Sequence, residues 1–297
     1  MTWERGIHIN NSRYEYIANL AHKALLVEVA ASPKPGLVDR FNCGAHADMD
    51  FFTFINSAAA IHPYLSRCAQ AGGESKTLDG LFLRLREFGV EAEKAMLLAT
   101  QGVNTHKGAI FSMGLVTASA GYGMEHGGTR PSQILKICSE LCEGLVEQDL
   151  VLKQESRQTA GERLFAQYGI TGVRGEAQEG FPMVKNISLP LFQTLMEEGL
   201  SINDCCVQTL LHLISQTCDT NILSRTGLKG LSFAQGYAKI VLDRGGILKG
   251  KDIVEAMDRE FIARNISPGG CADLLVVTCF LYFLKNNGYL TKRPCND

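Results

Sequence analysis

The sequence lacks the features that mark membrane, secreted and nucleic-acid-binding proteins. No apolar run approaches the roughly 20 residues that a membrane-spanning helix needs, and residues 1–11 lack the basic and then apolar pattern of a signal peptide. The formal net charge of -2 excludes the broad positive field with which nucleic-acid binders neutralise phosphates. These absences predict a cytoplasmic protein that binds neither nucleic acid nor membrane.

Paired metal-binding cysteines are also missing. The chain has 10 cysteines, but they are scattered over 297 residues without C-x-x-C pairs. Cys138 and Cys142 share one helix face, whereas a zinc site would need further cysteine or histidine ligands. The cysteines are therefore interpreted as free cytosolic thiols rather than as zinc ligands or a disulfide framework.

Alternating strand patterns are almost absent, and helical periodicity takes their place. The length and the 45% hydrophobic content fit one large domain with a substantial core. The sequence therefore predicts an all-α fold, with residues 1–297 as a single domain of roughly ten to twelve helices and the site at converging helix ends. The expected helices cover residues 12–31, 49–70, 78–99, 107–122, 131–147, 156–168, 187–199, 202–217, 232–243, 252–264 and 271–287.

Charged and glycine-rich residues are concentrated in five short segments at predicted helix ends. These segments are SPKPGLVDRFNCGAHADMD (32–50), GVNTHKG (102–108), GVRGEAQEGFP (172–182), DTNILSRTG (219–227) and NISPGGCADLL (265–275). Exposed ion pairs contribute little stability. The five segments, which together hold both signs of charge, are therefore interpreted as parts of one site for a polyanion and a metal ion.

Two of the segments have the form of phosphate-binding loops. A glycine-containing loop that leads into a helix offers unpaired N–H groups and a partial positive charge to an anion. GVNTHKG and SPGGCADLL both have this form, and Lys107 adds a point charge. An ordinary capped helix start, with Asn104, Thr105 or Ser267 as the N-cap, is the alternative for each.

Carboxylates and cations in the same segments complete the predicted site. Magnesium prefers oxygen ligands and is usually shared between carboxylates and substrate phosphates, while arginine matches phosphate oxygens in a bidentate way. His46 is open to a catalytic, ligand or structural role. The remaining candidates are Asp39, Asp48, Glu176, Asp219, Asp273, Lys34, Arg40, Arg174 and Arg225.

Taken in order, the five motifs resemble those of the triphosphoribosyl-dephospho-CoA synthases. The resemblance extends over roughly residues 30–280 and implies ATP and 3'-dephospho-CoA as substrates, Mg²⁺ as cofactor and adenine as leaving group. It implies transfer of the triphosphoribosyl group to the 2'-hydroxyl of dephospho-CoA. One departure is Cys271, which stands where the family usually has serine in SPGGSADLL.

The expected roles follow from this resemblance and from the chemistry of glycosyl transfer, which needs carboxylates for base and electrostatic roles. Glu176, His46 and Asp39 are the predicted catalytic residues, with Glu176 favoured as general base. Asp48, Asp219 and Asp273 are the predicted magnesium ligands. Substrate binding is expected from Lys34, Arg40, Asn104, Thr105, His106, Lys107, Gly108, Arg174, Asn221, Arg225, Ser267, Gly269 and Gly270.

Several alternatives remain at this stage. The product would pass to a holo-acyl-carrier-protein synthase acting on citrate lyase, but the same activity could serve malonate decarboxylase. A magnesium-dependent N-glycosidic hydrolase and a nucleotide-binding regulatory module are the rival functions. The sequence leaves the oligomeric state open, a homodimer included, and it leaves open which group protonates adenine.

Overall fold

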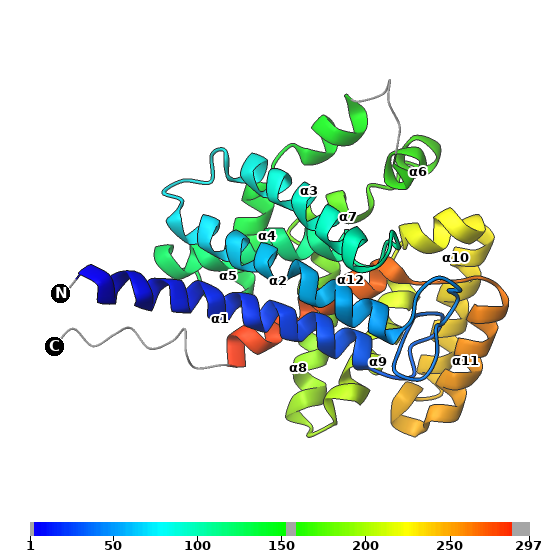
Figure 1. Cartoon of the computed structure of the whole chain (residues 1–297). Helices are drawn as coiled ribbons and strands as arrows, with labels where there is room; N and C mark the ends of the chain where they lie inside the picture. Colours follow the sequence, from blue (N-terminus) through cyan, green and yellow to red (C-terminus); the bar gives the residue numbers. More distant parts are fainter. Residues whose placement is uncertain (1–2, 153–158, 287–297) are drawn as a thin grey trace.

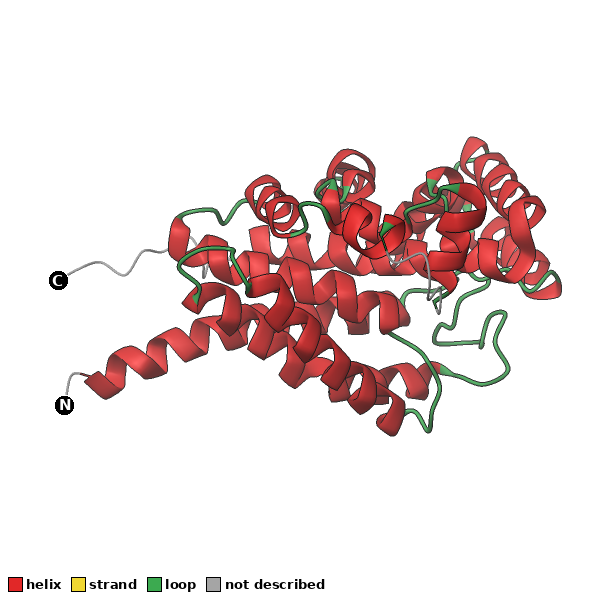
Figure 2. Cartoon of the chain, turned by 90° about the horizontal axis from the view of Figure 1, so that it is seen from above, coloured by secondary structure: helices red, strands yellow, loops and turns green. Residues whose placement is uncertain are grey.

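The structure is a computed structural model that describes residues 3–152 and 159–286. Within these ranges it contains helices and loops and no strand, which confirms the all-α prediction (Figure 2). The α-helices are α1 (Trp3–Ala30), α2 (Phe51–Glu74), α3 (Leu81–Ala99), α4 (Lys107–His126), α5 (Pro131–Leu141), α6 (Ala160–Tyr168), α7 (Gly172–Gln178), α8 (Leu189–Glu197), α9 (Ile202–Gln216), α10 (Thr220–Asp243), α11 (Lys251–Ala263) and α12 (Gly269–Asn286). Short π-helices η1 (Glu147–Val151) and η2 (Val184–Ser188) and the 3₁₀ turn η3 (Gly246–Lys249) complete the list.

Helices α4, α9 and α12 form much of the core and are covered by the others (Figure 1). Helix α12 is long and apolar enough by composition to cross a membrane, but 61% of it is buried inside the protein. It packs against α1, α4, α8 and α9. Its apolar composition is therefore that of a core helix.

Helices α2 and α4 approach each other closely because glycines face the partner backbone. A Cβ atom added to Gly72 would lie 1.9 Å from the carbonyl oxygen of Ala118, and one added to Gly121 would lie 2.0 Å from that of Ala69. This packing holds the C-terminal half of α4 against α2, while the GVNTHKG segment ends at the opposite, N-terminal end of α4.

Several predicted helix boundaries were wrong. Helix α1 begins at Trp3 rather than at residue 12. Helix α10 begins at Thr220, so the 219–227 segment is largely helical, with a kink at Gly227 where φ is 66°. Helix α7 lies within a segment that was interpreted as a connection. The predicted helix 156–168 starts in residues outside the described ranges, and α6 covers its remainder.

Loop 31–50 folds back over α9, α10 and α11 (Figure 1). The Ser32 N–H donates to Asn203 Oδ1 in α9, and the Gly36 N–H donates to Asp258 Oδ1 in α11. Arg225 of α10 donates to the Ala45 carbonyl. These contacts place the loop at the edge of the site.

Candidate active site

A cavity of about 1100 Å³ lies where the N-terminal ends of α4, α10 and α12 meet α7 and loop 31–50. Each of the five predicted polar segments contributes to its lining. The expected convergence of these segments is therefore present in the fold. Most predicted site residues line it: Lys34, His46, Asn104, Thr105, His106, Lys107, Gly108, Arg174, Glu176, Asp219, Asn221, Arg225, Ser267, Gly269, Gly270 and Asp273.

Glycines allow the N-termini of α4, α10 and α12 to meet. A Cβ atom on Gly108 would lie 1.9 Å from an oxygen of Asp273, and one on Gly269 would lie 2.4 Å from the Asn221 amide nitrogen. No larger residue fits at either position without displacement of these side chains. Three partial positive charges from helix N-termini are thus directed at one region of the cavity.

Asp219 links two of these helices. Its Oδ1 accepts hydrogen bonds from the N–H groups of Asn221 and Ile222 at 2.8 and 3.1 Å, and so caps α10. Its Oδ2 accepts from the Cys271 N–H at 2.8 Å, at the start of α12. Burial raises the pKa of Asp219, although these N–H donors oppose the rise. Both of its oxygens are therefore engaged by backbone N–H groups.

Cys271 does not contact the cavity in the way a phosphate ligand would. Its thiol is buried beside Asp219 and Thr217, and burial raises its pKa well above the usual value. The side chain at the position where the family usually has serine is therefore buried and does not line the cavity.

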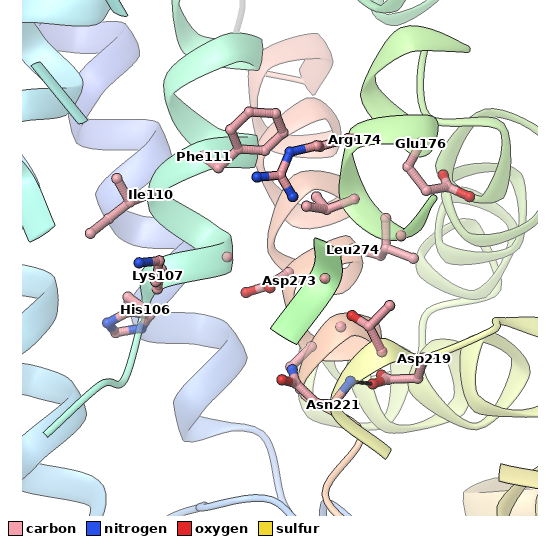
Figure 3. Close-up of a pocket in the computed structure, with 18 of the residues that line it drawn as sticks. His106, Lys107, Ile110, Phe111, Arg174, Glu176, Asp219, Asn221, Asp273 and Leu274 are labelled. Carbon is pink, nitrogen blue, oxygen red and sulfur yellow. Dashed lines mark hydrogen bonds between the residues drawn. The ribbon is translucent and has the colours of Figure 1, made fainter. Parts of the chain in front are cut away.

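Asp273 projects from α12 toward the N-terminal end of α4 (Figure 3). Among the described residues it makes no hydrogen bond or ion pair, and its remaining accessible surface faces the cavity. Burial raises the pKa of Asp273 well above its usual range, and the nearby charges of Asp219 and Glu28 raise it further. Both effects favour the protonated form of the carboxyl group.

The pKa values of both candidate histidines are lowered, which disfavours the imidazolium form in each. Burial lowers the pKa of His106 to about 3, and the charge of Lys34 contributes. His106 Nδ1 lies 2.6 Å from Ser57 Oγ, which accepts a hydrogen bond from Thr105. Burial and the Arg225 charge lower the pKa of His46, and Asp48 only partly opposes them. His46 Nε2 lies 2.9 Å from Ser267 Oγ.

The cations of the cavity differ in how strongly protein acids neutralise them. Lys34 Nζ lies 2.5 Å from buried Glu28, and Lys107 Nζ lies 2.9 Å from Glu93. Arg225 instead donates to the Ala45 carbonyl and to Asn265. In the described part of the chain Arg225 pairs with no carboxylate within ion-pair distance, so its charge is available to a bound anion.

Glu176 and Arg174 lie on opposite sides of α7 (Figure 3). Residues two apart on a helix do not face each other, and Arg174 pairs with Asp149 and Glu162 instead. Arg174 therefore does not pair with Glu176. Glu176 Oε2 accepts a hydrogen bond from the Met183 N–H at 3.3 Å. Burial raises the pKa of Glu176 from 4.5 to about 7.

This raised pKa predicts a pH-dependent stability difference between wild type and Glu176→Gln. Because the folded state holds the proton more tightly than the unfolded state, the stabilisation is full below pH 4.5 and is lost as the pH rises through about 7. Relative to Glu176→Gln, wild type should lose up to roughly 3 kcal/mol over this window. Urea unfolding at several pH values measures the difference. Glu255→Gln, which replaces an exposed glutamate on α11, is the control and should follow wild type.

Three predicted residues lie outside the cavity lining: Asp39, Arg40 and Asp48. Asp39 is buried and accepts N–H hydrogen bonds from Lys34, Phe41 and Asn42, so it braces its own loop. Arg40 donates to Asn203 at the surface. Asp48, with 65% of its side chain exposed, lies 3.9 Å from His46.

The predicted magnesium ligands do not assemble into a metal cage. Within the described residues, no group of three or more His, Cys, Asp and Glu side chains is placed to hold a metal ion. Asp48 does not line the cavity, although it lies beside His46, and the oxygens of Asp219 are taken by backbone N–H groups. Only Asp273 of the three presents an uncommitted carboxyl group to the cavity.

Sequence reasoning missed four charged residues that line the cavity and lie outside the five polar segments: Glu28 of α1, Arg86 and Glu93 of α3, and Asp149 of η1. Asp149 is buried and pairs with Arg86 and Arg174. The only sequence signal for Arg86 was that it follows Arg84 by two residues on a predicted amphipathic helix.

Comparison with known proteins identifies the family. Residues 14–292 match the model of the ATP:dephospho-CoA triphosphoribosyl transferase family. A probable 2-(5''-triphosphoribosyl)-3'-dephosphocoenzyme-A synthase from Citrobacter koseri is 45% identical over 279 residues, which cover 92% of each chain. One of the same name from Vibrio cholerae serotype O1 is 44% identical, over 90% of this chain and 88% of the relative. No solved structure gives a significant match. The chain belongs to the ATP:dephospho-CoA triphosphoribosyl transferase family.

Proposed function

We propose that this chain transfers the 5-triphosphoribosyl group of ATP to the 2'-hydroxyl of 3'-dephospho-CoA and releases adenine. The C1'–N9 bond of ATP breaks and a bond from C1' to the acceptor oxygen forms, while the hydroxyl proton is lost and adenine gains one. The observation that carries the proposal is the cavity formed by the family's five motifs, in which three helix N-termini meet beside the Asp273 carboxyl group.

The helix N-termini supply the seat for the triphosphate. Lys107 and Arg225 add positive charge, and Asn104, Asn221 and Ser267 add polar groups on the same walls. Because the triphosphate is retained rather than cleaved, its binding energy can hold the ribose in a reactive position. The phosphate seat thus acts in catalysis through positioning.

Two carboxyl groups with raised pKa values suit the two proton transfers. Asp273, which is directed into the cavity and whose pKa is raised by burial, is the proposed acid that gives a proton to the departing adenine. Glu176, whose pKa of about 7 allows it to ionise, is the proposed base for the acceptor hydroxyl. Asp39 is left out of this assignment because its oxygens hold the loop backbone.

We propose that Mg²⁺ enters the site bound to the phosphates of ATP, because the described carboxylates form no cluster that could hold it alone. The product is proposed as the precursor of the citrate lyase prosthetic group, made in the cytoplasm and passed on to a holo-acyl-carrier-protein synthase. The alternative is that the product is made for malonate decarboxylase. The identity of the neighbouring genes would distinguish the two pathways.

The test of this function is adenine release measured with and without dephospho-CoA. A transferase should form adenine in equal amount to a product heavier than dephospho-CoA by one triphosphoribosyl unit, and little adenine without the acceptor. Equal adenine release without dephospho-CoA would indicate the hydrolase. ATP left intact over a long incubation with the acceptor would indicate a binding module without catalysis.

A further inference from the structure

Two arginines from different helices meet on one buried carboxylate at the wall of the cavity. Asp149 has only 4% of its side chain exposed, and its Oδ2 pairs with Arg86 Nη2 and, at 3.3 Å, with Arg174 Nε. Arg86 and Arg174 keep 39% and 22% of their side chains exposed, and both line the cavity. Asp149 therefore anchors two guanidinium groups at one place on the wall.

The anchoring leaves most of the arginine donors unused. Each guanidinium carries five N–H donors, and Asp149 Oδ2 takes one nitrogen of each. Glu162 lies 3.7 Å from Arg174 Nη2, and no other acid contacts Arg86 within the described ranges. An anion at this place would be bound mainly by directional N–H groups of the two guanidinium groups.

Packing holds both arginines in place before a ligand binds. Arg86 Cζ lies 5.2 Å from the centre of the Phe82 ring. Gly161 lies against the other guanidinium, since a Cβ atom there would come within 3.3 Å of Arg174 Nη1. Figure 3 shows Arg174 projecting from α7 into the cavity, above Asp273 and apart from Asn221. The pair thus lies apart from the helix N-termini of the triphosphate seat.

We propose that Arg86 and Arg174, positioned by Asp149, form a second phosphate seat that binds the diphosphate of dephospho-CoA. This inference rests on the proposed function, which requires two nucleotides and therefore two polyphosphate groups in one cavity. The more highly charged triphosphate is assigned to the three helix N-termini with Lys107 and Arg225. The cavity of about 1100 Å³ exceeds the usual size of a pocket for a single small ligand.

The test is a comparison of substrate-specific constants in Arg86→Gln. The KM for dephospho-CoA should rise roughly ten- to a hundredfold, the usual scale for loss of charge-assisted hydrogen bonds, while kcat and the KM for ATP stay within about twofold. Arg86→Lys keeps the positive charge but loses the planar guanidinium group. Its KM for dephospho-CoA should therefore fall between those of wild type and Arg86→Gln. Asp149→Asn should act in the same direction, because both guanidinium groups lose their anchor.

Arg67→Gln is the matched control, because Arg67 also pairs with an acid, Glu91, and lies over an aromatic ring, Phe88, but outside the cavity. It should leave both KM values unchanged. A rise in the KM for ATP in Arg86→Gln, or a lower melting temperature with both KM values unchanged, would overturn the proposal.

Calorimetric binding of dephospho-CoA separates this proposal from the proposed function. Wild-type protein that binds dephospho-CoA but releases no adenine would contradict the transfer reaction, and weaker binding by Arg86→Gln would still support the seat. Equal binding by both proteins would refute the seat even in an active enzyme.

Discussion

Asp273→Asn should lower kcat roughly a hundred- to ten-thousandfold, the usual range for the loss of a general acid or base, with little change in the binding of ATP. The amide preserves the shape of the side chain but has no acidic proton to give to adenine. Asp273 is well placed for this role because it faces the cavity between α4 and α12 and makes no hydrogen bond or ion pair with the described residues. Steady-state adenine release and equilibrium binding of ATP measure the two quantities.

Asp48→Asn is the control for Asp273, since it removes an equivalent carboxylate outside the cavity, with 65% of the side chain exposed. It should retain near wild-type turnover. Near-normal kcat in Asp273→Asn would remove Asp273 from the mechanism and leave Glu176 as the carboxyl group to test. A large loss of ATP binding together with kcat would assign Asp273 to phosphate or magnesium binding instead.

Asp219→Ala should destabilise the fold by roughly 3 to 5 kcal/mol, because three backbone N–H donors lose their acceptor. Two belong to the first turn of α10 and the third to Cys271 at the start of α12. The side chain is buried, so water cannot readily replace it. Urea unfolding measures the loss. The sequence predicted Asp219 as a magnesium ligand. If metal binding were its main role, Asp219→Ala would change the free energy of unfolding little.

Asp50→Ala provides the comparison for Asp219. Asp50 also caps a helix, α2, through the Thr53 N–H, but it lies at the exposed surface. The loss of stability in Asp50→Ala should be much smaller, because water can hydrogen-bond to the freed Thr53 N–H donor. Similar stability losses in the two variants would show that the link between α10 and α12 contributes nothing beyond ordinary capping.

The sequence predicted the long helices well because their apolar residues recur at helical spacing. It missed α7, because a helix of seven residues with two glycines gives no clear period. Buried Gly175 and Ala177 pack it into the protein instead. It also missed the helical start of α10, where Asp219 was interpreted as part of a connection. In α7 and at the start of α10, tertiary contacts rather than the local sequence pattern determine the helical structure.

The convergence of the five motifs could be predicted, but the role of each carboxylate could not. Asp39 satisfies N–H groups of its own loop, a local bond that aspartate often makes and that no spacing reveals. Arg86 and Asp149 are 63 residues apart in sequence and meet only through the packing of α3 and η1. Single-residue roles therefore required the fold.

The fate of the γ-phosphate tests the central claim most directly. ATP radiolabelled in its γ-phosphate is incubated with Mg²⁺, dephospho-CoA and the wild-type protein, and the products are separated. Transfer of the triphosphoribosyl group predicts that the label appears in the product that contains dephospho-CoA, in equal amount to free adenine. Label in pyrophosphate or free phosphate, or an acceptor that carries only the γ-phosphate alongside ADP, would contradict the account.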